Sequence, residues 1–212
     1  MSRLLGYLLL LTLSSVSSAE TIQIKVTKKR GKAIQDAVVY VASKDIQRTD
    51  KMANFSIDQV DKQFANYVTV VQVGSKIQFP NHDKIKHHVY SFSQAKTFEI
   101  PLYKGTPSKP IHLDKVGEVS LGCNIHDWMQ GYIFVTPTPY FGLTDKQGLA
   151  QLQLPPGQYE IAIWHPDIKK KYAKKRYKID STKQENMSVK IALKFRFNSK
   201  KSKPVEYDEL EY

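Results

Sequence analysis

The sequence has few of the features that mark a disulfide scaffold, a membrane protein or a helical protein. A single cysteine, Cys123, stands among 212 residues, which excludes a disulfide within the chain. The longest apolar run, residues 4–13, is shorter than the ~20 residues that cross a bilayer as a helix. Long amphipathic helical patterns are also absent. We therefore expect no stable membrane insertion.

The first residues have the layout of a secretory signal peptide. Arg3 precedes the apolar run, and small residues ending at Ala19 follow it, which is the usual order of parts in such a signal. We expect residues 1–19 to be removed on export and the mature protein to be periplasmic. An unpaired thiol is unusual in an oxidising compartment, so Cys123 is either buried and inert or the ligand of a metal ion.

Acidic residues are fewer than basic ones. The chain has 32 lysines and arginines against 20 aspartates and glutamates, a formal net charge of +12. The densest basic run is "KKKYAKKRYK", residues 169–178. We favour the interpretation that these lysines keep exposed strand edges from pairing with other chains; a docking patch for an acidic partner is the alternative. No nucleic-acid-binding module is recognisable, so we expect no nucleic acid partner.

Strand patterns, by contrast, recur along the whole chain. Short runs with period-two alternation, such as "TIQIKV", "YVTVVQV", "GEVSLGC" and "QYEIAIW", are divided by glycine, proline, asparagine and aspartate. This rhythm predicts an all-β sandwich or barrel rather than a β-α-β sheet. Residues 201–212 have little to bury and are predicted to form a flexible tail.

The stretch "LGCNIHDWMQGYIFV" contains three candidate metal ligands. Alternation along "GEVSLGC" places Cys123 on the inward face at the end of a strand, and a tight loop then brings His126 and Met129 to the same end before the return strand. Thiolate and thioether are soft ligands and imidazole suits copper, so a second histidine would complete a blue-copper set. Methionine is a poor ligand for zinc, which prefers four closed nitrogen and sulfur ligands.

The second histidine has two candidates, His87 and His88, in "FPNHDKIKHHVYSFS". Adjacent residues of a strand point to opposite faces, so both cannot be equatorial ligands without a distortion. The residues alone leave both open; the family resemblance given next favours His87, with His88 as the alternative.

These two stretches resemble the copper-binding loop and the upstream strand of cupredoxins, with a short amicyanin-like spacing of the Cys, His and Met in the loop. "VGSKIQFPN", followed by "HHV", is similar to the segment that carries the upstream histidine of plastocyanin-like proteins. The whole chain looks closest to exported proteins labelled methylamine utilization proteins. The resemblance implies a Greek-key β-sandwich at residues 50–137, and a single type 1 copper ion held by His87, Cys123, His126 and Met129.

The flanking segments resemble a different family. "TDKQGLAQLQLPPGQYEIAIW" and "VTKKRGKAIQDAVVYVAS" are similar to carboxypeptidase-regulatory-like and Cna-B-like domains, which are small Ig-like or transthyretin-like sandwiches. We therefore expect residues 20–49 and 138–200 to form one second sandwich, split by insertion of the cupredoxin domain. The alternative is that the early strands belong to the cupredoxin and that a separate sandwich follows.

These resemblances imply a periplasmic one-electron carrier rather than an enzyme, with no catalytic residues. Trp128 and the exposed edge of His126 would form the port toward a redox protein partner. Two other functions stay open: a copper chaperone or storage protein, and a binding or scaffold module in which the metal is structural or absent.

Overall fold

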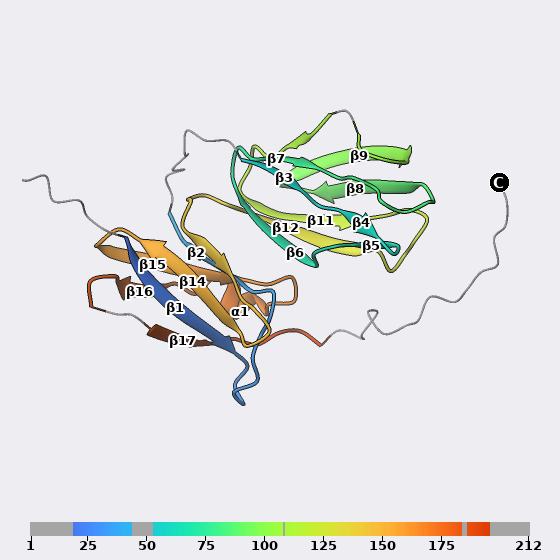
Figure 1. Cartoon of the computed structure of the whole chain (residues 1–212). Coiled ribbons are helices and arrows are strands. Elements are labelled where there is room, and N and C mark those ends of the chain that lie inside the picture. The colour runs from blue at the N-terminus through green and yellow to red at the C-terminus, as the bar shows by residue number, and fades with distance from the viewer. Residues whose placement is uncertain (1–18, 44–52, 108, 184–185, 196–212) are drawn as a thin grey trace, which may run out of the picture.

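The computed structural model describes residues 19–43, 53–107, 109–183 and 186–195 (Figure 1). The predicted tail at 201–212 and all but Ala19 of the predicted signal peptide lie outside the described residues. The described chain is built from strands and one short helix, α1 (Lys170–Ala173), so the predicted all-β class is confirmed. None of the helical structure described is long and apolar enough to cross a membrane.

One sandwich, here called the split sandwich, takes its strands from two separate parts of the chain, one before residue 42 and one after residue 140. Its first sheet has the order β14-β1-β17 and its second the order β13-β2-β15-β16. Strands from before residue 42 thus pair directly with strands from after residue 140 (Figure 1). The strands are β1 (Glu20–Thr27), β2 (Val38–Val41), β13 (Phe141–Leu143), β14 (Leu149–Leu154), β15 (Gln158–Trp164), β16 (Tyr177–Asp180) and β17 (Asn186–Lys190).

The segment between β2 and β13 forms the second unit, here called the central sandwich. A five-stranded sheet, β6-β12-β11-β8-β9, lies against a three-stranded sheet, β10-β7-β3, with a small β4-β5 hairpin at one end (Figure 1). The strands are β3 (Asn54–Ser56), β4 (Gln59–Val60), β5 (Gln63–Phe64), β6 (Val68–Gln72), β7 (Lys76–Gln78), β8 (His87–Ser93), β9 (Lys96–Tyr103), β10 (Ile111–His112), β11 (Gly117–Gly122) and β12 (Gln130–Thr136). The division into domains stays a prediction: one domain of residues 20–49 and 138–200, and a second of residues 50–137.

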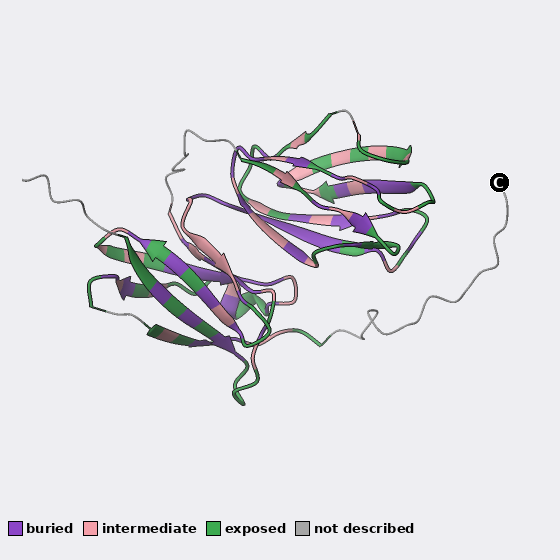
Figure 2. Ribbon diagram, viewed as in Figure 1, coloured by how far each residue is buried: buried purple, intermediate pink, exposed green. Residues whose placement is uncertain are grey.

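Each sandwich has its own core because alternate residues of its strands face inward. In β1 the inward residues Ile22, Ile24 and Val26 are fully buried, and the residues between them are exposed (Figure 2). In the central sandwich the corresponding core contains Val119, Ile133 and, at its edge, Cys123. The metal-ligand types identified in the sequence therefore lie at one end of a packed core.

A third cluster of buried residues joins the two sandwiches. Tyr132 and Phe134, on the outer face of β12, pack with Val38 and Trp164 of the split sandwich. The Phe134 and Trp164 rings are stacked, with centroids 4.7 Å apart and an interplanar angle of 22°. The Trp164 indole N–H also donates to the Glu118 carboxylate at 3.3 Å. These contacts explain why β12 is buried along most of both faces.

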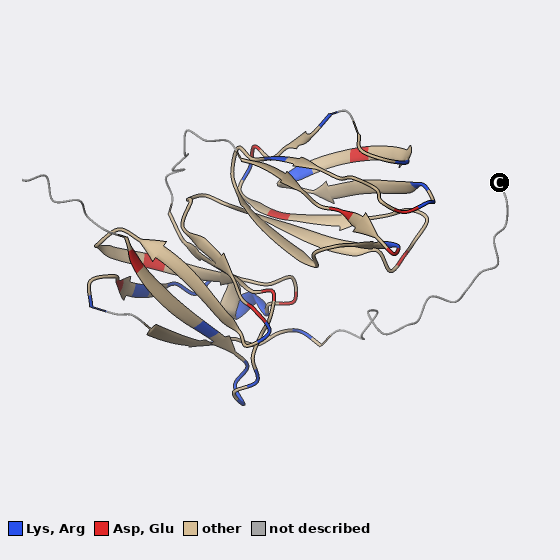
Figure 3. Ribbon diagram, in the orientation of Figure 1, with Lys and Arg blue, Asp and Glu red and all other residues tan. Residues whose placement is uncertain are grey.

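The basic segments come together at one end of the split sandwich. The exposed turn with Lys28, Lys29, Arg30 and Lys32 follows β1, and the exposed lysines around α1 lie near it (Figure 3). Backbone bonds from Ile191 N–H to the Thr27 carbonyl and from Lys169 N–H to the Ala192 carbonyl, both 2.9 Å, tie the two segments together. Whether this end binds an acidic partner stays a prediction.

Candidate metal centre

The hairpin of β11 and β12 positions two of the candidate ligands. The strands pair antiparallel from Gly117↔Val135 to Gly122↔Gln130, so residues 123–129 form the loop at the hairpin's tip. Inside it, Met129 N–H donates to the His126 carbonyl at 2.9 Å, which turns the loop back on itself. Cys123 and His126 are only 3% and 8% exposed, so both side chains point inward, as alternation along β11 predicts for the cysteine.

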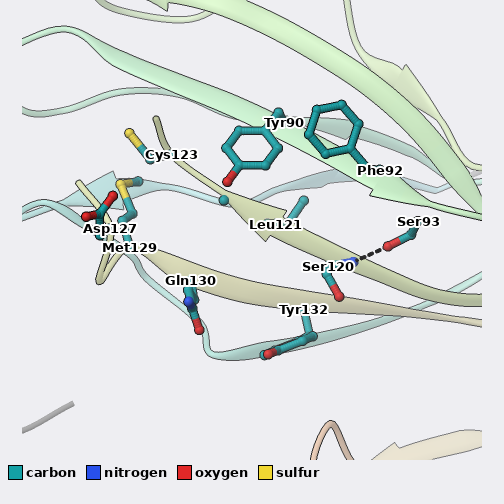
Figure 4. A pocket seen from close by; sticks show the side chains of 11 residues that line it. Tyr90, Phe92, Ser93, Ser120, Leu121, Cys123, Asp127, Met129, Gln130 and Tyr132 are labelled. Carbon is teal, nitrogen blue, oxygen red and sulfur yellow. Dashed lines mark hydrogen bonds between the residues drawn. The ribbon is translucent and has the colours of Figure 1, made fainter. Parts of the chain in front are cut away.

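Met129 is 1% exposed and belongs to the same buried cluster as Cys123. In Figure 4 the sulfur atoms of both residues lie on the same side of the hairpin. The structure thus places the thioether within the same end of the core as the thiol.

His87, the first residue of β8, completes a compact set of donor atoms. The Cys123 Sγ lies 4.0 Å from His87 Nδ1 and 3.7 Å from His126 Nδ1. One donor atom from each of the three residues lies within 4.8 Å of the others, and all three residues are buried. The two imidazole rings are 4.9 Å apart between centroids. Three residues predicted from the sequence therefore converge in space.

His88 lies outside this set. Its Nε2 is 2.8 Å from the Glu99 carboxylate of the neighbouring strand β9, and its ring packs 5.7 Å from that of Tyr90. The pairing of β8 with β9 is irregular between His87 and Val89, yet the two histidines still point apart. Of the two sequence candidates, only His87 reaches Cys123.

Behind His87 lies a carboxylate that sequence reasoning did not single out as part of the site. Asp83 Oδ2 is 2.7 Å from His87 Nε2. The same carboxylate accepts hydrogen bonds from the backbone N–H groups of Asp61 and Lys62, at 2.8 and 2.9 Å. Burial favours a higher pKa for the Asp83 carboxyl, but the bonds from Lys62, His87 and Asp61 outweigh it and hold the pKa below its usual value. An acidic residue four positions before a ligand-type histidine was the available signal.

Asn81 fixes the shape of the loop that carries Asp83. Its side-chain amide donates to the carbonyls of Ile85 and Tyr103 at 2.9 and 3.0 Å, and its side-chain oxygen accepts from Asp83 N–H at 2.9 Å. The residue is 5% exposed. Because the amide bonds two groups of its own loop and the end of β9, it ties the segment before β8 to the neighbouring strand.

His126 lies closest to the surface at this end. Its pKa is lowered, first by burial and then by the charges of His87 and Lys62, which favours the neutral, ligating form of the ring. The Trp128 ring packs 5.3 Å from it. Ile125, in the same loop, is 48% exposed. The loop therefore presents a small apolar surface beside the imidazole.

An open groove of about 560 Å³ runs along the outer face of the hairpin from this end (Figure 4). Tyr90, Ser120, Gln130 and Tyr132 are among the residues that line it, and Cys123 and Met129 lie at one end. Aromatic and polar side chains make up most of its wall.

The donor set fits a soft or borderline metal ion. Two imidazole nitrogens and one cysteine sulfur face one point, with a methionine in the same cluster, and such mixed nitrogen and sulfur sites suit copper better than magnesium or calcium. Cys123 is a free, buried cysteine. Of the other histidines, His82 and His112 are exposed and His165 lies in the split sandwich, so none of them belongs to the site.

The chain is similar to solved structures over a little under half of its length. No protein-family model and no curated protein sequence matches it. A copper-containing nitrite reductase from Thermus scotoductus SA-01 is 22% identical, with a TM-score of 0.38, over 46% of this chain and 25% of that chain. A methionine-to-alanine variant of amicyanin in its Cu(I) form is 15% identical and a reduced tryptophan-to-tyrosine variant is 16% identical, both with a TM-score of 0.36 over 46% of this chain and 98% of theirs. The chain thus covers a quarter of the length of the nitrite reductase.

Proposed function

We propose that the chain is a cupredoxin-type protein that binds one copper ion and carries single electrons. The observation that supports this is the convergence of His87 Nδ1, Cys123 Sγ and His126 Nδ1 on one buried point. Met129, in the same buried cluster, would be the weak fourth ligand. Copper bound there would supply the Cu(I)/Cu(II) couple.

The residues around the site would keep its geometry the same in both oxidation states. Cys123 is anchored by the β11–β12 ladder and His87 by β8 and Asp83, while a short turn fixes His126. Such a frame limits rearrangement when an electron enters or leaves. Burial of the three ligands limits the access of water to them. We therefore propose a carrier rather than an enzyme.

The partner would be another redox protein, met at the end of the central sandwich. The imidazole of His126 is the candidate ligand in the surface loop, with Trp128 and Ile125 beside it. Transient electron-transfer encounters need only a small contact area, which the apolar surface of Ile125 and Trp128 would supply. A periplasmic location, as expected from the N-terminal segment, would place the protein among such partners.

The first prediction tests the site directly. Adding Cu(II) to the mature protein is expected to produce an intense visible charge-transfer band, because a copper–thiolate bond forms. The band is expected to vanish in Cys123→Ala and to shift or weaken in His87→Ala. The matched control is His88→Ala, which removes the adjacent imidazole and is expected to leave the band in place.

Two outcomes would count against electron transfer. A wild-type protein with no such band would leave the third function, a scaffold module without copper, as the better account. A band combined with rapid loss of copper to a chelator and irreversible voltammetry would instead favour copper delivery. Reversible voltammetry of a stably loaded protein is the result expected here.

A further inference from the structure

Asp83 forms the only carboxylate contact described at the three converging ligands. We propose that Asp83 is a positioning residue that fixes which nitrogen of His87 faces the metal and makes the site favour Cu(II) over Cu(I). This inference rests on the proposed copper site and adds a specific residue that tunes it.

The geometry determines the tautomer of His87. A neutral imidazole carries one N–H, and the Asp83 carboxylate, 2.7 Å from Nε2, accepts only a donor at that nitrogen. The hydrogen is thereby held on Nε2, and the lone pair is left on Nδ1, the atom that faces Cys123. His87 is completely buried, so no water competes for the Nε2 hydrogen. The ring is oriented for ligation before any metal binds.

Asp83 is itself held in place by an unusual turn. Asp61 and Lys62, the two residues of the β4–β5 hairpin turn, have φ values of 54° and 57°. Non-glycine residues in this left-handed region are strained, and such turns ordinarily contain asparagine or glycine. Here both N–H groups point at the Asp83 carboxylate, and these two bonds offset the strain. The turn, the carboxylate and His87 therefore form one continuous hydrogen-bonded unit.

The charge of Asp83 acts on the two oxidation states unequally. Its side chain is only 14% exposed, so its field is less screened by water than that of a surface carboxylate. Cu(II) carries one more positive charge than Cu(I) and is stabilised more by a nearby anion. A carboxylate bonded to the N–H of a ligand histidine also makes that ring a stronger donor. Both effects lower the reduction potential of the site.

The neighbouring residue supplies a matched control. His88 Nε2 is 2.8 Å from Glu99, a carboxylate–imidazole pair of almost the same length. This pair lies outside the ligand cluster, and the Glu99 side chain is 62% exposed. Glu99→Gln therefore removes one carboxylate charge from a similar but more exposed pair on the adjacent residue, without touching the proposed ligands.

The second prediction concerns Asp83→Asn, which keeps an acceptor for His87 and removes the charge. The preference of the loaded site for Cu(II) is expected to fall by about 10-fold to 100-fold, and each tenfold change raises a one-electron potential by about 59 mV. Voltammetry of the copper-loaded wild type, Asp83→Asn and Glu99→Gln measures the shift. An unchanged potential in Asp83→Asn, or an equal shift in Glu99→Gln, would overturn the tuning role.

A measurement on the metal-free protein separates this inference from the proposed function. Nitrogen NMR of the His87 ring is expected to show the Nε2-protonated tautomer in the wild type and a tautomer mixture in Asp83→Ala. If the wild type binds no copper, the proposed function fails, while this measurement still decides the positioning role. A tautomer mixture in the wild type would overturn that role whether or not copper binds.

Discussion

Gly122 lies at the pairing of β11 with β8. It lies opposite Tyr90 and directly precedes Cys123. A Cβ atom at this position would lie 2.6 Å from Tyr90 Cζ and 2.7 Å from the phenol oxygen, closer than van der Waals contact allows. The glycine therefore lets the hydroxyl end of the Tyr90 ring come close to the backbone next to the proposed thiolate ligand. Figure 4 shows Tyr90 beside Cys123.

We predict that Gly122→Ala destabilises the protein by about 1–3 kcal/mol, because the new methyl group must displace the Tyr90 ring or the strand. Urea unfolding followed by circular dichroism measures the change. Ser120→Ala, two residues earlier on the same face, is the control and is expected to have little effect. Adding Tyr90→Ala should relieve much of the loss. A loss that is the same size in the Tyr90→Ala background would contradict this account.

At the scale of strands, the buried Thr144 hydroxyl adds side-chain bonds to the strand pairing that joins the split sandwich. Thr144, just after β13, accepts a bond from Ala37 N–H and donates one to the Ile34 carbonyl, both 2.8 Å long. Its backbone also pairs with Ala37 and Asp36. Residues more than 100 positions apart in the chain are thus held by side-chain and main-chain bonds together.

We predict that Thr144→Val destabilises the protein by roughly 2 kcal/mol or more, since it leaves a buried N–H and a buried carbonyl without their partner. Thr144→Ser keeps the hydroxyl and is expected to lose much less. Equilibrium urea unfolding of both variants is the measurement. Equal stability of the valine and serine variants would show that shape, not hydrogen bonding, matters at this position.

The sequence was informative about strands and about the ligand loop. Period-two alternation placed Val119, Leu121 and Cys123 on one buried face, because a half-buried strand has no other way to cover its apolar residues. The three-residue spacing from Cys123 to His126 is short enough for a single turn to bring the two side chains together. These features are local, so a pattern along the chain can reveal them.

Contacts between distant segments were not predictable in the same way. Asp83 stands four positions before His87 in the sequence, but the contact between them depends on how Asn81 and the turn at Asp61 and Lys62 shape the loop. The strand pattern left His87 and His88 open, because it does not say which face of β8 looks toward Cys123. In the structure His87 Nδ1 lies 4.0 Å from Cys123 Sγ, whereas His88 contacts Glu99. The confirmed prediction is the all-β class; the domain boundaries and the copper ligands stay predictions.

For the whole molecule, the main question is how the two sandwiches are coupled. Trp164 is the central residue of their contact, because it stacks on Phe134, lies 6.3 Å from the Tyr132 ring and bonds Glu118. All three partners belong to the β11–β12 hairpin, whose far end carries Cys123 and His126. The indole therefore links the split sandwich to the strands that hold the proposed metal site, without reaching the ligands.

We predict that Trp164→Ala uncouples the two sandwiches, with a loss of about 3–5 kcal/mol from the interface. In the wild type this contact is expected to make the two sandwiches unfold together, in one calorimetric transition. In Trp164→Ala they are expected to unfold separately, in two transitions. Copper binding by the central sandwich is expected to persist, since every proposed ligand lies within residues 87–129. The control is Trp128→Ala, which removes the chain's other tryptophan, beside His126. It should change the metal site and leave the unfolding pattern as in the wild type. A Trp164→Ala variant that lost copper binding but kept the wild-type unfolding pattern would mean that the indole supports the ligand loop rather than the junction between the sandwiches.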